Sequence, residues 1–118
     1  MFKSLLARVP EAAGDVLGIA LVSLDGIAIE KIHADASINL DTLIAEFTDR
    51  MKRSQSATEE MGVGELTEQV IYAERAVVIL REVHEEYFIL CAAKPDGNHG
   101  RVRHAIRCVL PDLAQELV

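Results

Sequence analysis

The sequence predicts an α+β domain in which one antiparallel sheet is covered by helices on both faces. The dipeptide Asp25-Gly26 separates two apolar runs and is typical of a tight β-hairpin, because both residues tolerate the positive φ of a short turn. A long amphipathic segment follows the hairpin. Three further strand-like segments come after it, joined by short turns. Strands that are joined by short turns pair antiparallel, so these observations together indicate a single sheet.

The N-terminal part of the chain predicts a helix followed by the hairpin. Residues 2–13 carry apolar side chains at spacings of three and four, which is typical of an amphipathic helix. Pro10 lies within this segment, so we expect the helix to end or bend near it. The two strands of the hairpin are expected at residues 16–23 and 27–33.

The segment after the hairpin predicts a long helix. Apolar and small side chains recur at helical spacing from Leu40 to Met61, and polar side chains fill the other positions. Asn39 can cap the N-terminus, since its side chain can accept a free backbone N–H of the first turn. Gly62 and Gly64 mark the end. A helix of about 22 residues is roughly 33 Å long, at about 1.5 Å per residue.

The C-terminal half predicts a three-stranded meander and a final helix. The expected strands cover residues 65–73, 76–83 and 87–93. The turns between them, at residues 74–75 and 84–86, are too short for any connection other than an antiparallel one. The final helix is expected from about His99 to Leu117 and contains Pro111, which should bend it.

The strands differ in polarity, and the difference predicts their places in the sheet. Residues 76–80 and 87–93 are apolar without alternation, so both faces of these strands must be covered. The strand at residues 65–73 is more polar and fits an edge of the sheet. An exposed edge can pair with another chain. We therefore expect an edge-to-edge homodimer.

Length and charge limit the possible functions. The chain has 118 residues, which is the size of one domain spanning residues 1–118. A formal net charge of −7 argues against nucleic acid as the main partner, because phosphate binding requires a basic face. No apolar run is long enough to span a membrane, and the N-terminus lacks the apolar centre of a signal peptide. We therefore expect a cytoplasmic protein that neither binds nucleic acid nor inserts into a membrane.

The residues that carry chemistry in enzymes form no recognisable pattern here. None of the four histidines has metal-ligand spacing to a cysteine or to another histidine. The glycines at residues 62–64 and 97–100 lack the lysine of a phosphate-binding loop. Cys91 and Cys108 lie in apolar segments, and we expect both to be buried free thiols. The sequence thus predicts no catalytic residue, no metal site and no cofactor.

The order and spacing of these pieces resemble the roadblock / dynein light chain family, and within it the bacterial MglB-like group. The matching pieces are the hairpin at residues 20–29, the long helix ending near residues 62–66, the meander, and the loop at residues 95–103. The resemblance covers nearly the whole chain. It implies the topology αββαβββα and a five-stranded antiparallel sheet of order 2-1-5-4-3, with the third strand at an edge.

The resemblance also implies where partners bind. Members of the family form homodimers through the third strand and the middle helix, so that two sheets join into one. The implied dimer residues are Thr67, Glu68, Gln69, Val70, Ile71, Tyr72, Phe47, Met51 and Ser54. In MglB-like proteins the paired middle helices dock a Ras-like small GTPase and stimulate its GTP hydrolysis. The implied docking residues are Asp49, Arg50, Lys52, Arg53, Ser56 and Glu59.

Two function classes follow from the resemblance. One is a non-catalytic regulator of a Ras-like GTPase, and the other is an adaptor that pairs with other roadblock proteins in a signalling or motility complex. Arg50 and Arg53 are formal candidates for an arginine finger, although the resemblance implies a mechanism that reshapes the GTPase instead. A third class, a small-molecule sensor, is disfavoured by the scarcity of aromatic residues.

One basic cluster stands out against the acidic composition. Arg101, Arg103, His104 and Arg107 lie close together near the start of the expected final helix. Pairing with the protein's own acids is the first interpretation, a contact for an acidic partner is the second, and a membrane surface is the third.

Overall fold

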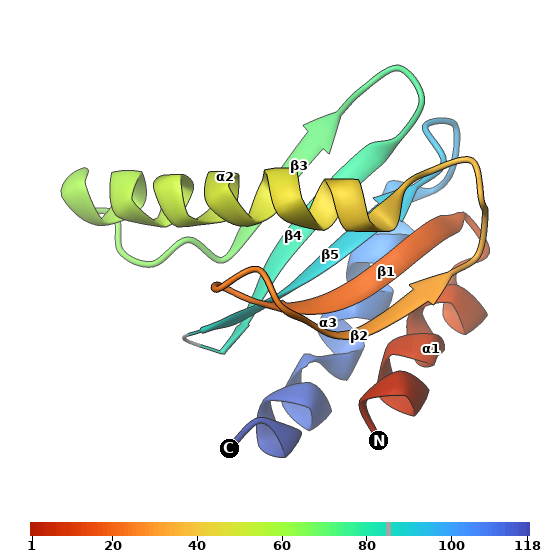
Figure 1. Ribbon diagram of the computed structural model, residues 1–118, viewed down its shortest axis with the longest axis horizontal. Helices are drawn as coiled ribbons and strands as arrows, with labels where there is room; N and C mark the ends of the chain where they lie inside the picture. Colours follow the sequence, from red (N-terminus) through yellow and green to blue (C-terminus); the bar gives the residue numbers. More distant parts are fainter. Residues whose placement is uncertain (85) are drawn as a thin grey trace.

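The computed structural model describes residues 1–84 and 86–118, and its elements occur in the expected order (Figure 1). The helices are α1 (Phe2–Ala12), α2 (Leu40–Glu60) and α3 (His99–Glu116). The strands are β1 (Val16–Ser23), β2 (Ala28–His33), β3 (Glu68–Tyr72), β4 (Val77–His84) and β5 (Tyr87–Ala93). They form one antiparallel sheet of order β2-β1-β5-β4-β3, which confirms the expected fold.

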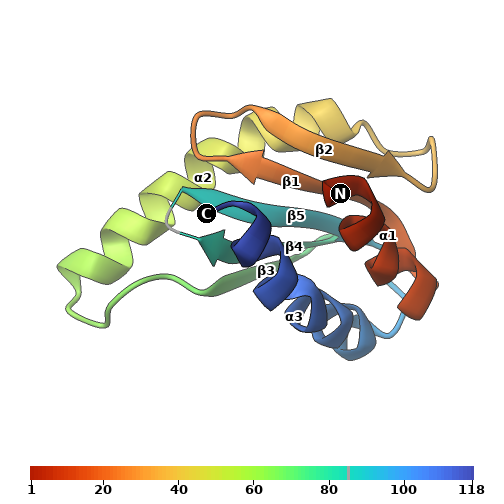
Figure 2. The same cartoon turned by 90° about the horizontal axis from the view of Figure 1, so that it is seen from below.

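Helices cover both faces of this sheet. α1 and α3 lie side by side on one face, and α2 crosses the other (Figures 1 and 2). The central strands β1 and β5 are buried almost throughout, and for β5 the apolar run at residues 87–93 predicted this burial. Their side chains alternate between two cores: Ile19 and Ile89 pack under α1 and α3, while Ala20 and Leu90 pack under α2. None of the described helices is both long and apolar enough to cross a membrane.

The ends of α2 and α3 are fixed by local contacts. The Asn39 side chain accepts a hydrogen bond from the backbone N–H of Thr42 at 3.1 Å, which confirms the predicted cap. Asn98 caps α3 in the same way, through the backbone N–H of Arg101 at 3.0 Å. After α2, Gly62 adopts a φ of 75°, a conformation that side chains disfavour, and it allows the chain to reverse towards β3.

The hairpin turn is longer than the predicted dipeptide. Ser23 N–H donates to the carbonyl of Ile27, and Gly26 N–H donates back to the carbonyl of Ser23, both at 2.9 Å. These bonds enclose residues 24–26, of which only Gly26 has a positive φ, at 86°. The turn is therefore a three-residue loop that ends in a left-handed glycine, and Asp25 needs no positive φ.

Several predicted boundaries require correction. β3 begins at Glu68 rather than at residue 65, and β2 begins at Ala28 rather than at residue 27. α1 ends at Ala12, two residues after Pro10, which agrees with the expectation that the helix ends near this proline, and Val9 is buried in the core. Part of the predicted turn at 84–86 lies outside the described residues, since residue 85 is not among them.

Candidate partner-binding surface

α2 is held by the sheet along only part of its length. Its buried side chains, Leu40, Ile44, Thr48 and Met51, all belong to the N-terminal part of the helix. Residues 52–60 include no buried side chain, and in Figure 1 this end of α2 extends past the edge of the sheet. The side chains of residues 52–60 are exposed or half-buried, so another chain can reach them. The extension is therefore a surface that is suited to contact with another chain.

A charged hollow of about 460 Å³ lies along the outer side of α2. Its lining comprises Glu46, Asp49, Arg50, Arg53, Ser54 and Ala57. Asp49 and Arg53 form an exposed ion pair at 3.1 Å, and the Arg50 guanidinium lies 5.7 Å from the centre of the Phe47 ring. Exposed contacts of this kind contribute about 1 kcal/mol or less. These charges can therefore rearrange to meet a partner at little cost.

The six predicted docking residues are all exposed, but they do not form one site. Asp49, Arg50 and Arg53 line the charged hollow, whereas Lys52 and Ser56 do not. Glu59 belongs to a second hollow of about 220 Å³, which it lines with Gln55, Glu65 and Glu82. The structure thus divides the predicted docking residues between different sides of α2.

The second hollow is acidic, and its charges repel one another. Partial burial of Glu82, together with the neighbouring Glu65 carboxylate, raises the pKa of the Glu82 carboxyl. The raised pKa means that the folded protein binds a proton at Glu82 more readily than the unfolded chain does.

β3 lies at the edge of the sheet and pairs only with β4. Two bonds fix which residues of β3 direct their backbone N–H and C=O groups towards β4: Ala73 N–H donates to the Ala76 carbonyl, and Glu82 N–H donates to the Thr67 carbonyl. In an antiparallel pair, hydrogen-bonded and non-bonded positions alternate. Thr67, Gln69, Ile71 and Ala73 therefore direct their backbone groups towards β4. Glu68, Val70 and Tyr72 direct theirs outwards, as the prediction of an open edge strand requires.

Some of the predicted dimer residues lie at the surface of the protomer, and others lie inside it. Ser54 and Gln69 are 3.3 Å apart between Oγ and Oε1, so the outer side of α2 and the open edge of β3 form one continuous surface. Tyr72 is 68% exposed at the end of β3, with its ring 5.6 Å from that of His99. Two members of the predicted set lie inside the protomer. Met51 is fully buried on the side of α2 that faces the sheet, and the Glu68 side chain is only 10% exposed.

Glu68 is occupied by partners within its own chain. Arg103 Nε donates a hydrogen bond to Glu68 Oε1 at 2.7 Å, and Arg81 lies 3.5 Å from Glu68 Oε2. These ion pairs tie β3 to β4 and to α3. For one member of the basic cluster they also support the first interpretation, pairing with the protein's own acids, because Arg103 pairs with an acid of the same chain. The side chains of Met51 and Glu68 are thus unavailable for the predicted dimer contacts.

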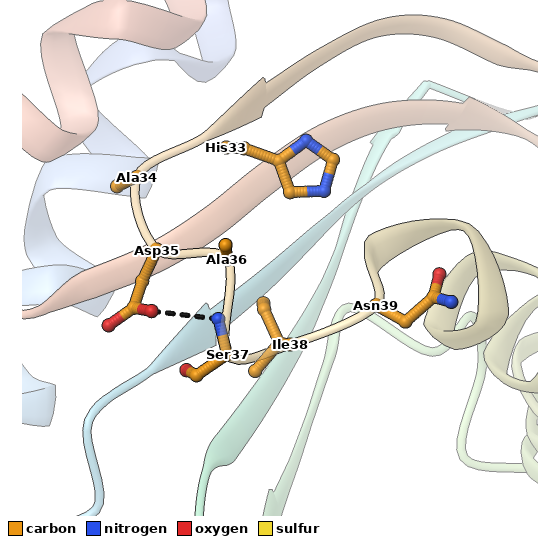
Figure 3. Close-up of a pocket in the computed structure, with 7 residues that line it drawn as sticks. All are labelled: His33, Ala34, Asp35, Ala36, Ser37, Ile38 and Asn39. Carbon is orange, nitrogen blue, oxygen red and sulfur yellow. Dashed lines mark hydrogen bonds between the residues drawn. The ribbon is translucent and has the colours of Figure 1, made fainter.

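A different hollow, of about 580 Å³, lies at the loop before α2 and is lined by residues 33–39 (Figure 3). The Asp35 carboxylate accepts a hydrogen bond from the backbone N–H of Ser37 at 2.8 Å, and this bond is the main reason why the pKa of Asp35 is lowered. Figure 3 shows the Asp35 carboxylate and the His33 ring pointing in different directions. The side chains of Asp35 and Asn39 bond to backbone N–H groups two and three residues ahead, and the polar groups of this hollow do not converge on one point.

Comparison with known families decides the classification of this fold. A family model described as the Roadblock/LC7 domain matches residues 3–93. The chain belongs to the Roadblock/LC7 domain family. The match covers every element except α3.

Solved structures share the complete roadblock fold with this chain. Myxococcus xanthus MglB superimposes with a TM-score of 0.85 at 16% identity, covering 98% of this chain and 96% of that one. The gliding protein MglB from Thermus thermophilus gives 0.83 at 18% identity, with coverage of 96% and 85%. MglC from Myxococcus xanthus gives 0.70 at 24% identity, with 98% of both chains covered. A search of curated proteins finds no match.

Sequence reasoning missed one apolar feature of this roadblock surface. Met61 and Val63 are 71% and 67% exposed where the chain leaves α2. Met61 continues the apolar periodicity of the helix, but α2 has already passed the edge of the sheet at that point. The signal that could have identified this exposed pair is an apolar residue at the very end of a long helix, where the helix passes beyond the sheet.

Proposed function

We propose that this roadblock domain is a non-catalytic homodimeric regulator that docks a Ras-like small GTPase on the outer face of α2. Membership of the Roadblock/LC7 family supports a regulator or adaptor role. The observation that carries the proposal is the charged, unburied part of α2, which adjoins the open edge of β3.

The dimer is the first part of this proposal. Two β3 strands can pair through the outward backbone groups of Glu68, Val70 and Tyr72. Because Ser54 contacts Gln69, a second copy on β3 also lies beside α2. Burial of Met61 and Val63 against that copy would remove exposed apolar surface. The proposed contact set therefore adds these two residues and omits the side chains of Met51 and Glu68.

The GTPase contact is the second part. Alternating charges on a rigid helix favour steering of a charged partner and specificity more than raw affinity. Asp49, Arg50 and Arg53 provide such charges in the hollow on α2. The similarity to the MglB structures makes a Ras-like GTPase the partner to test first.

The test uses the purified protein and the Ras-like GTPase encoded nearest to its gene. We expect a complex in one nucleotide state, weakened roughly tenfold by Arg50→Glu, since loss of a steering charge and introduction of repulsion cost about 1.4 kcal/mol. Arg75→Glu, an equal change of charge in the exposed β3–β4 turn, is the matched control. GTP turnover measured in parallel separates activation from simple docking. Absence of a complex in both nucleotide states would refute the proposal.

A second candidate function is an adaptor that joins other roadblock chains. It is favoured by the sheet having two edges, since β2 as well as β3 has a neighbour on one side only. A protein with two unpaired edges can bind two different chains. Co-purification with another roadblock protein of the same organism, together with no binding of the GTPase, would favour this function over the first.

A further inference from the structure

Figure 2 shows α1 and α3 side by side on the face of the sheet opposite to α2. Residues of these two helices line a groove of about 430 Å³. Its apolar floor is made by small side chains: Ala105 and Val109 are buried, and the exposed Ala12 lines the groove beside them. Arg101, His104 and Cys108 stand at its rim and are all exposed. The small floor residues leave room for inserted side chains, and the rim supplies charge and hydrogen-bond donors.

The rim is basic although the protein as a whole is acidic. α3 carries Arg101, Arg103 and Arg107 in its first half, and its two acids, Asp112 and Glu116, lie near its other end. Arg103 pairs with Glu68, and Arg8, which also lines the groove, pairs with Asp112 at 3.0 Å. Among the described residues no acid pairs with Arg101 or Arg107 within ion-pair distance. Of these two, only Arg101 lines the groove, so one uncompensated positive charge stands at its rim.

The placement of these charges opposes the requirements of the helix itself. The N-terminus of a helix carries a partial positive charge, so anionic side chains stabilise the first turn and cationic side chains disfavour it. α3 has no acidic residue in its first turn and no basic residue in its last turn. Arg101 and Arg103 instead occupy the N-terminal end. A bound anionic group would relieve this repulsion, whereas a cationic one would increase it.

We propose that the groove between α1 and α3 docks an acidic amphipathic helix of a partner protein. Apolar side chains of that helix would enter above Ala12, Ala105 and Val109, and its carboxylates would meet Arg101 and His104. The groove and the α2 surface lie on opposite faces of the sheet. A partner in the groove therefore does not compete with the proposed GTPase or with pairing at β3, and the site goes beyond the proposed function.

Cys108 provides a direct probe of occupancy. It is exposed at the rim, whereas Cys91 is fully buried, with the pKa of its thiol raised to about 12 by burial. Iodoacetamide should therefore alkylate Cys108 in the native protein and leave Cys91 as an internal control. The rate at each cysteine is measured by mass spectrometry.

The probe peptide is a synthetic amphipathic helix with leucines at positions i, i+3, i+4 and i+7 and glutamates on both flanks. The control peptide has lysine in place of every glutamate. At ten times its Kd, the glutamate peptide should slow alkylation of Cys108 about tenfold, because a covered thiol does not react. Arg101→Glu should weaken binding roughly tenfold, Arg101→Lys should retain it, and Arg75→Glu, at a residue that does not line the groove, should leave it unchanged.

Four outcomes would overturn the proposal. The glutamate peptide fails to protect Cys108 at concentrations of about 1 mM, the lysine peptide protects it equally, or Arg75→Glu weakens binding as much as Arg101→Glu does. The fourth is protection of Cys108 without any peptide as the protein concentration rises, which would assign the groove to a second copy of this chain. No GTPase enters this experiment, so its result is independent of the proposed function.

Discussion

Substitution of Val70 by proline should dissociate the proposed dimer while the protomer remains folded. The backbone N–H of Val70 faces away from β4, so proline removes a donor that the protomer itself does not use. Gln69 is one residue away, but its N–H faces β4, and proline there would break the protomer's own sheet. Val70 is therefore the position at which dimerisation and folding can be separated.

The magnitude follows from the hydrogen-bond pattern of β3. Two strands paired antiparallel about Val70 would form about six hydrogen bonds, from Glu68, Val70 and Tyr72 of each copy. Val70→Pro removes the two central bonds. At about 0.5–1.5 kcal/mol net for each, the loss is about 1–3 kcal/mol, which weakens the dimer roughly 5- to 150-fold.

The assay is sedimentation velocity over a dilution series, with far-UV circular dichroism to confirm that the protomer is folded. Lys31→Pro is the matched control, because Lys31 lies on the opposite edge strand, β2, with its N–H also directed outwards. It gives up only an exposed ion pair to Asp41, worth about 1 kcal/mol or less. An unchanged Kd for Val70→Pro, or an equal loss in Lys31→Pro, would refute the reasoning about β3.

Three further predictions concern the fold itself. Asn39→Ala should lower the free energy of unfolding by about 1 kcal/mol in urea denaturation, because it removes the cap of α2, and no change would show that the cap contributes nothing. Leu90→Ala should cost about 2–5 kcal/mol in the same assay, since Leu90 is fully buried under α2, and a smaller loss would contradict close packing there. Glu82→Gln should raise the Tm at neutral pH. The raised pKa of Glu82 makes its ionisation destabilising as the pH rises above the ordinary value of 4.5, so the gain should disappear below that pH. An equal gain at both pH values, or from exposed Glu74→Gln, would contradict this explanation.

Much of the fold could be predicted because the signals that define it are local. Asn39 caps α2 through a residue three positions away, and the glycines at 62 and 64 follow its end with positive φ. The apolar runs of β4 and β5 indicated helices on both faces without reference to any distant residue. The hairpin was predicted correctly, but the length of its turn was not, because Asp25-Gly26 is compatible with loops of more than one length.

The candidate surfaces depended on contacts between distant segments. Periodicity placed Met51 with Phe47 on one side of the helix, but the extent of the sheet beneath α2 determines that Met51 is buried. Cys108 was expected to be buried because its neighbours are apolar. It is exposed, since Val109 and Ala105 take the inward positions of α3.

The sequence by itself determined the order of the elements, the long amphipathic helix, the polar edge strand and the resemblance to roadblock proteins. Each of these depends on residues that are a few positions apart, where backbone geometry alone fixes which side chains share a face. Only the tertiary structure decided which of those faces stay open. Glu68 is withdrawn by Arg103, 35 positions away, and the groove at Arg101 exists because α1 packs beside α3. Such contacts depend on where a second segment lies in space, and no local pattern in the chain records that position.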